Sequence, residues 1–273
     1  MNMRHLLTLT LLVTATLPLA PTLSHAQSGG FDRAAFAAYV ETQGGRNAPR
    51  FYAYSGTVYG IPSGEILATV DGYQQARVYM ADPGTTTAYI VRRAFLLYQT
   101  PDRAKTLKVY PDVRAAITSA PLSIARVKLD GDRLETATLT GIKGRTSTNA
   151  TLPETLSAAR EDQAFVFRRV IVPPNPQEQP VELFETVYQA HAGAPPGIRS
   201  VMTKVANNTG FLPAGGRHML HMIWRPIASY ADLSASVRQF IEAEAPDMKN
   251  LPSSLAESFA ALGVEQSSLD SKR

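Results

Sequence analysis

The chain has 273 residues, 44% of them hydrophobic, with a formal net charge of +4 at pH 7 and no cysteine. The lack of cysteine excludes disulfides, thiolate metal sites and a cysteine nucleophile, so stability has to come from a hydrophobic core. The small and scattered positive charge argues against nucleic acid as a partner.

The N-terminus has the three regions of a bacterial-type secretory signal peptide. Arg4 makes the n-region positive, residues 6–17 are apolar, and Ser24 and Ala26 place small residues at the −3 and −1 positions of a cleavage site. The apolar run is broken by Pro18 and is too short to span ~30 Å of hydrocarbon, although an uncleaved anchor is the alternative. We expect Sec-type export, cleavage near Ala26, and a periplasmic or secreted protein with no later transmembrane segment.

Residues 27–265 are predicted to form a single β-rich domain, followed by a frayed tail at 266–273. From Arg50 onward, hydrophobic and polar residues alternate with a period of two, and turn residues recur about every ten residues. The clearest turns are Asp82-Pro83-Gly84 and Asp130-Gly131-Asp132. About ten strands with short connections predict a mostly β fold, an antiparallel β-barrel or a barrel-like sandwich with a few short flanking helices. The predicted strands cover residues 51–60, 65–71, 75–80, 87–99, 105–110, 125–130, 133–140, 164–172, 181–190, 200–206 and 218–224.

Capping residues and apolar stripes predict the short helices. The first follows Asp32 and stops at Gly44, and the second extends from a capping-box pattern at Thr151 to about Arg160. The third starts at Asp232, and its apolar stripe has to be covered by the rest of the protein. That stripe consists of Leu233, Val237, Phe240 and Ile241, and a last helix is capped by Ser254 and Glu257 and carries Leu255, Phe259 and Leu262.

Two blocks of sequence resemble a known family. One is His218-Met-Leu-His-Met-Ile-Trp-Arg225 with the helix that ends at Pro246, and the other is Tyr52-Ala-Tyr-Ser-Gly-Thr-Val-Tyr59. Over residues 31–252 the chain resembles domain-of-unknown-function family eighteen-thirty-eight, an uncharacterised family of mostly exported bacterial proteins. The family implies no established activity. Its members carry a tryptophan-rich segment before the final strand, whereas this chain has residues 207–216, so a pocket lined by that segment would differ here.

The predicted mature chain contains His191, His218 and His221. In a strand, residues three apart point to opposite faces, so His218 and His221 cannot bind one metal ion together, and no metal site or cofactor is expected. A histidine satisfied within the sheet is the plainer interpretation for each. The candidates for a catalytic acid or base are His191 and His218.

Two arginine doublets, Arg92-Arg93 and Arg168-Arg169, interrupt apolar strands. The two members of each doublet point to opposite faces, so one guanidinium from each strand must face the buried side. Arg93 shares its face with Tyr89, Val91, Phe95 and Leu97, and Arg169 shares its face with Phe165, Phe167 and Ile171. These aromatic stripes make Arg93 and Arg169 the predicted inward residues.

A buried arginine needs a partner, because an unpaired buried charge costs several kcal/mol. Glu182 and Glu185 on the next predicted strand could supply a structural ion pair. Alternatively, the guanidinium of Arg93 or Arg169 binds the carboxylate or phosphate of a ligand through its bidentate fork.

Aromatic residues complete the candidate ligand-binding set. Tyr54 and Tyr59 lie on opposite faces of the first strand, which fits a strand with a helix on one side and a cavity on the other, although ordinary packing explains it too. Trp224 shares a face with His218 on the last predicted strand. The leading hypothesis is a barrel that binds a small, partly apolar ligand, which could be acidic. The alternatives are an enzyme (a lyase, isomerase or hydrolase) that uses His and Arg in the same cavity, and a structural envelope protein without a cavity.

Overall fold

The computed structural model describes residues 30–80, 84–110, 121–142, 145–149, 154–173, 175, 180–192, 194–207, 212 and 216–270. Within these ranges, the side chains of residues 142, 145–149, 154, 155 and 270 are not described. The predicted signal peptide at 1–26, the turn residues Asp82 and Pro83, the capping residue Thr151, most of the segment 207–216 and residues 271–273 lie outside the described residues.

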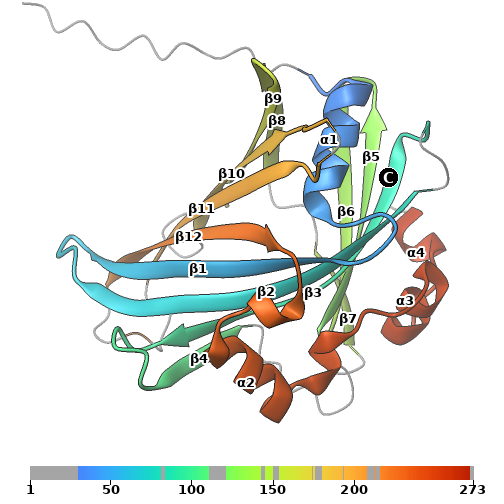
Figure 1. Ribbon diagram of the computed structural model, residues 1–273. Helices are drawn as coiled ribbons and strands as arrows, with labels where there is room; N and C mark the ends of the chain where they lie inside the picture. The colour runs from blue at the N-terminus through green and yellow to red at the C-terminus, as the bar shows by residue number, and fades with distance from the viewer. Residues whose placement is uncertain are drawn as a thin grey trace, which may run out of the picture.

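The fold is mostly β, as the sequence predicts, and consists of one sheet of twelve strands that curves into a nearly closed barrel (Figure 1). The strands are β1 (Arg50–Ile61), β2 (Ile66–Met80), β3 (Thr87–Gln99), β4 (Thr106–Tyr110), β5 (Leu122–Asp130), β6 (Arg133–Ile142), β7 (Arg145–Asn149), β8 (Glu154–Glu161), β9 (Ala164–Ile171), β10 (Val181–Gln189), β11 (Gly197–Asn207) and β12 (Arg217–Ile227). Their order in the sheet is β7-β6-β5-β3-β2-β1-β12-β11-β10-β9-β8, with β4 paired to β3. Neighbouring strands pair antiparallel throughout this order.

The turn signals have mixed outcomes. Gly131, with φ +62°, joins β5 to β6 in the predicted hairpin. In contrast, Asp71 and Gly72 do not divide two strands, because β2 continues through them and pairs there with both β1 and β3. A Cβ on Gly72 would lie 2.6 Å from the carbonyl oxygen of Phe95, so this glycine allows a close approach of strands rather than a turn.

One predicted helix is wrong. The segment expected to form a helix up to Arg160 is strand β8, which pairs with β9 from Glu154 to Glu161. Leu156 and Ala158 alternate along it and pack in the same hydrophobic cluster as Phe167 of β9. The pairing partner and this cluster outweigh a local capping pattern.

Helix α1 (Arg33–Gln43) is confirmed and fills one end of the barrel. The Oδ1 atom of Asp32 accepts a hydrogen bond from the amide of Ala35 at 2.7 Å, which caps its N-terminus. Figure 1 shows α1 between the β8–β9 end and the β5–β6 end of the curved sheet. Its hydrophobic side packs against both ends through Val127 of β5 and Phe167 of β9.

The remaining helices cover the outside of the sheet (Figure 1). They are α2 (Ala235–Glu244), preceded by the 3-10 turn η1 (Tyr230–Asp232), then the 3-10 turn η2 (Pro246–Lys249), α3 (Leu255–Leu262) and α4 (Ser267–Asp270). The predicted stripe of α2 is buried against Tyr73 of β2 and Phe95 of β3. The stripe of α3 packs on β5 and β6.

The C-terminal tail is more ordered than the sequence predicts. Residues 267–270 form α4, and Leu269 is 1% exposed against the cluster that includes Leu139 of β6 and Leu262 of α3. The burial of Leu269 and a hydrogen bond from Nε2 of Gln266 to the hydroxyl of Tyr89 at 2.9 Å therefore hold this segment against the rest of the protein.

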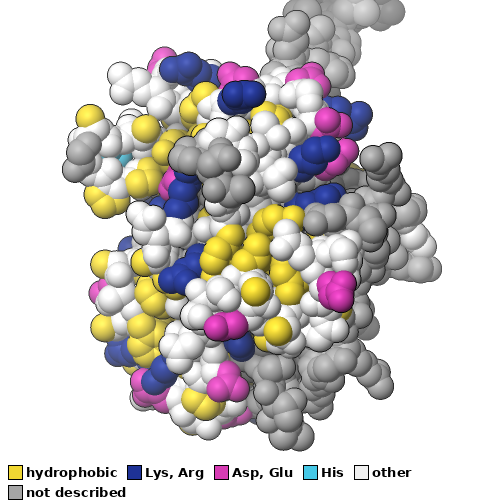
Figure 2. Space-filling view, turned by 90° about the vertical axis from the view of Figure 1, so that its right-hand side faces the viewer, with side chains coloured by type: hydrophobic (Ala, Val, Ile, Leu, Met, Phe, Trp, Pro, Cys, Tyr) yellow, Lys and Arg dark blue, Asp and Glu magenta, His cyan; other side chains and the backbone are white. Residues whose placement is uncertain are grey.

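Charged side chains of both signs are interspersed over the face shown in Figure 2, around a central hydrophobic area. None of the helices within the described ranges is both long and apolar enough to cross a membrane.

Candidate ligand-binding site

Strand β3 shows that the two faces of the sheet differ in what lies against them. Its odd residues from Val91 to Gln99 are buried, because the helices α2 and α3 cover the outer face. Its even residues from Arg92 to Tyr98 keep an intermediate exposure, although they point toward the inside of the barrel. The inside of the barrel, which we call the lumen, is therefore partly hollow.

A pocket of about 410 Å³ occupies the lumen away from α1. Residues of β1, β3, β4, β10, β11 and β12 line it, and apart from Phe95 they lie on the face opposite to the outer helices. Its size lies in the range of sites for small molecules. The apolar wall is made by Val58, Leu96, Met202, Leu220 and Met222.

Three aromatic rings stand on the inner side of this pocket. The ring centroid of Trp224 lies 5.9 Å from that of Tyr54 and 5.9 Å from that of Phe184. The hydroxyl of Tyr54 donates to Oε1 of Gln74 at 2.6 Å, which fixes the tyrosine against the wall. Burial raises the pKa of the Tyr54 hydroxyl, so it stays protonated and uncharged.

Charged and polar groups are also part of the pocket lining. The Nζ atom of Lys204 lies 2.7 Å from Oε1 of Glu182, and His218 lies beside them, 6% exposed. Burial and the positive charge of Lys204 lower the pKa of His218 below its usual value. Burial raises the pKa of Tyr98 to about 12. His218 is thus a neutral imidazole at neutral pH.

Two arginines lie deeper in the lumen, next to residues of the pocket. Arg92 is two residues from Ala94 on the same face of β3, and Ala94 lines the pocket. From the other wall, the guanidinium carbon of Arg169 lies 4.9 Å from the ring centroid of Phe184. Burial is the main cause that lowers the pKa of Arg92, the charge of Arg169 lowers it further, and the neighbouring tyrosines of α1 and β1 oppose the shift.

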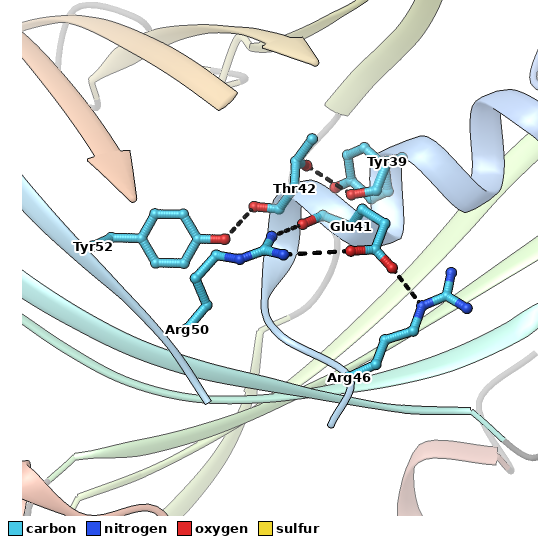
Figure 3. Close-up of polar contacts among 6 residues, drawn as sticks. All are labelled: Tyr39, Glu41, Thr42, Arg46, Arg50 and Tyr52. Carbon is cyan, nitrogen blue, oxygen red and sulfur yellow. Dashed lines mark hydrogen bonds and ion pairs between the residues drawn. The ribbon is translucent and has the colours of Figure 1, made fainter. Parts of the chain in front are cut away.

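A separate polar cluster ties α1 to the start of β1 (Figure 3). The carboxylate of Glu41 lies 2.6 Å from Nε of Arg46 and 3.4 Å from a terminal nitrogen of Arg50. Arg50 also donates to the carbonyl oxygen of Glu41, and the hydroxyl of Tyr52 donates to the carbonyl oxygen of Thr42 at 2.8 Å. The negative charge of Glu41 is therefore shared by Arg46 and Arg50.

Several sequence-predicted residues do face the lumen. Tyr54, His218 and Trp224 line the pocket, and Arg169 contacts the pocket residue Phe184. His221 points to the opposite face from His218, as the period-two argument predicts, and its Nδ1 lies 3.3 Å from Oγ1 of Thr203.

Three predicted residues do not reach the pocket. Arg93 was expected to point inward, but it lies on the outer face, 8% exposed, near Asp247 of η2 and Tyr73. Tyr59 also belongs to the outer face of β1, and His191 is exposed. The expectation for Arg93 fails because the outer face is apolar too, since the C-terminal helices cover it.

The predicted ion pairs also differ. Glu185 accepts from Nε of Arg168 at 2.9 Å on the outer face, and Glu182 pairs with Lys204. Sequence reasoning missed Arg92 and Phe184. The one sequence signal for Arg92 is its place in the doublet, because alternation puts it on the face opposite to Arg93, the face that it shares with Ala94.

No protein-family model and no curated protein matches this chain. Within the described part of the chain, no group of three or more His, Cys, Asp or Glu residues is placed to hold a metal ion.

Proposed function

We propose that this protein binds a small, partly apolar molecule inside its barrel. The observation that supports this proposal is the hollow lumen, a pocket of about 410 Å³ with an apolar and aromatic wall. A protein with a purely structural role would be expected to fill this space with side chains, because protein interiors are normally close-packed. The lumen instead combines apolar contact area with a few polar groups.

The proposal includes export. The n-region, apolar core and small residues that end at Ala26 support a signal peptide, and a chain without cysteine suits an oxidising compartment. Such a protein would meet its ligand in the periplasm or outside the cell. The resemblance to family eighteen-thirty-eight is part of the same proposal.

Trp224 provides a direct test, because it is the single tryptophan of the chain and it lines the pocket. Titration with N-phenyl-1-naphthylamine, a neutral apolar dye, should quench tryptophan fluorescence by energy transfer while the dye emission rises. Ala94→Leu fills part of the pocket and should weaken dye binding about tenfold, as expected when ~1.4 kcal/mol of binding free energy is lost. Ala104→Leu, at an exposed turn, is the matched control and should bind as the unchanged protein does. Equal dye binding by both variants would contradict the proposed site.

His218 favours one alternative, an enzyme in the same pocket. A buried neutral imidazole beside Lys204 can accept a proton at neutral pH. In that case a ligand found with the purified protein should be converted on incubation, and His218→Gln should abolish conversion while binding persists.

A further inference from the structure

The lumen contains a cation whose surroundings differ from those of a structural arginine. Among the residues that the structure describes, Arg92 has no hydrogen-bond or ion-pair partner, and its Nε atom is buried. The groups that act most strongly on its charge are Tyr39, Tyr52, Tyr54 and Arg169, and none of these is a carboxylate. Because an arginine stays protonated in a protein, this site carries positive charge without a negative partner from the described chain.

Two acidic groups, one at α1 and one in the pocket lining, have partners of their own. Glu41 at the base of α1 holds Arg46 and Arg50 (Figure 3), and Glu182 holds Lys204. Arg169 adds a second guanidinium, stacked on Phe184, and it repels Arg92. Two cations thus lie in one partly hollow lumen. Of these, Arg92 is the one without a partner among the described residues, and an unpaired buried charge costs several kcal/mol unless something neutralises it.

The position of Arg92 relative to the pocket suggests what neutralises its charge. Ala94, Tyr54 and Phe184 line the pocket and are also neighbours of Arg92 or Arg169. The partial exposure of Arg92 opens into the lumen, because the outer face of β3 is covered by helices. An occupant could therefore contact the apolar wall and a guanidinium at the same time.

We propose that Arg92, together with Arg169, forms an anion site at the inner end of the pocket and binds the acid group of an amphipathic ligand whose apolar part fills the pocket. This inference rests on the proposed binding function and adds the ligand class and its orientation, head inward and tail toward Glu182 and Lys204. The planar fork of a guanidinium makes two parallel hydrogen bonds to a carboxylate or a phosphate, and both are stronger in a lumen with little water.

Three ligands of equal chain length test the inference through the fluorescence of Trp224: decanoate, decyl phosphate and the neutral decanol. The unchanged protein should bind at least one of the two anions about 10- to 100-fold more tightly than decanol, as expected for a charged hydrogen bond. Whichever anion binds more tightly identifies the head group as carboxylate or phosphate. Equal binding of decanol and both anions would overturn the inference but leave the proposed function standing. Failure of all three to bind, together with failure of the dye, would overturn both.

Arg92→Met keeps the aliphatic stem and removes the charge. It should weaken the preferred anion about 10- to 100-fold and change decanol binding by less than about threefold. Arg92→Lys, which keeps the charge without the fork, should retain part of the preference for the anion. Arg225→Met, at an exposed position next to Trp224 and on the other face of β12, is the control and should leave all three affinities unchanged.

The apo proteins provide a second readout that does not depend on ligand binding. If Arg92 has no partner in the apo protein, Arg92→Met should melt at the same temperature as the unchanged protein or above it, because no carboxylate loses its partner. A large fall in the melting temperature of Arg92→Met, with the anion preference retained by Arg92→Met and Arg169→Met alike, would identify Arg92 as a structural residue and overturn the anion site.

Discussion

His218 should make the free energy of unfolding depend on pH. Burial and Lys204 lower its pKa in the folded protein, so the unfolded chain binds a proton at a higher pH than the folded one. The free energy of unfolding should therefore be fully retained above the unfolded pKa of about 6.5 and fall as the pH drops through that value. The loss should level off below the lowered folded pKa.

Urea unfolding between pH 8 and pH 5 measures this effect. His218→Gln should remove part of the decrease in unfolding free energy on acidification, whereas His221→Gln, exposed on the opposite face, should leave the decrease as it is. A His218→Gln variant that loses stability with acid as steeply as the unchanged protein would contradict this assignment.

Asp71 and Arg103 form an ion pair on the outer face. Nη1 of Arg103 lies 2.8 Å from Oδ2 of Asp71, and Asp71 is 4% exposed whereas Arg103 is at the surface. Burial raises the pKa of Asp71, and Arg103 lowers it in opposition. Arg103→Gln should therefore leave a poorly solvated carboxylate and cost about 1–3 kcal/mol at pH 7.

The pH dependence distinguishes this cause from a local distortion. Without Arg103, the pKa of Asp71 should rise further, so the variant should regain part of its stability as the pH is lowered from 7 to 5. Asp71→Asn combined with Arg103→Gln should lose less than Arg103→Gln alone. An equally large loss at every pH, and in the double variant, would exclude the ion pair as the cause.

The arginine doublets show what sequence can predict about a single residue. Alternation correctly separates Arg92 from Arg93 and Arg168 from Arg169 onto opposite faces. It cannot say which face is the lumen, because the helices make the outer face of β3 as apolar as an interior. Arg169 was assigned correctly since β9 carries its aromatic residues on the lumen side.

For helices and strands, the sequence prediction succeeds where residues close together in the sequence determine the structure. Helix α3 was predicted from its own caps, and the hydroxyl of Ser254 accepts from the amide of Glu257 at 3.1 Å. Strand β8 was missed because its pairing with β9 is not local. The sequence predicts a barrel in which a pocket is one possibility, but it does not predict the pocket itself. The reason is that residues from six strands together form the pocket.

Helix α2 should contribute a large part of the stability of the outer layer. Phe240 is 7% exposed, and its ring centroid lies 5.2 Å from that of Phe95. Phe240→Ala should lower the free energy of unfolding by about 3–5 kcal/mol, because it leaves a cavity beneath the helix. Chemical denaturation measures this loss, with Glu242→Ala on the exposed side of α2 as the control, expected within about 1 kcal/mol. A loss below about 1 kcal/mol for Phe240→Ala would mean that the ring is not part of the core.

In the molecule as a whole, the helices stabilise the sheet, and the lumen provides the space for the pocket. The outer helices bury one face of the sheet in two hydrophobic clusters, and α1 fills one end of the lumen. Stability therefore does not require the far end of the lumen to be filled. A mostly apolar pocket can remain open there, because three of the hydrophobic clusters lie elsewhere and the fourth forms the wall of the pocket.

Export and folding should use different parts of the chain. The first described residue is Gly30, and Phe31 is the first of the described residues with a buried side chain, 3% exposed. Its amide donates to the carbonyl oxygen of Asp132 at 2.7 Å, and its ring stacks on Phe167 with 5.8 Å between centroids. Cleavage after Ala26 would leave these contacts in place.

Sequencing the N-terminus of protein recovered from the periplasm or the medium should therefore give Gln27 or a residue close to it. A chain that begins at Gln27 should melt at the same temperature as the full chain. Phe31→Ala in that shorter chain should cost about 3–5 kcal/mol, since the ring is part of the contact between α1 and β9. Recovery of Met1 from an envelope fraction would show instead that the segment is an uncleaved anchor, and the stability comparison would still report whether Phe31 begins the folded domain.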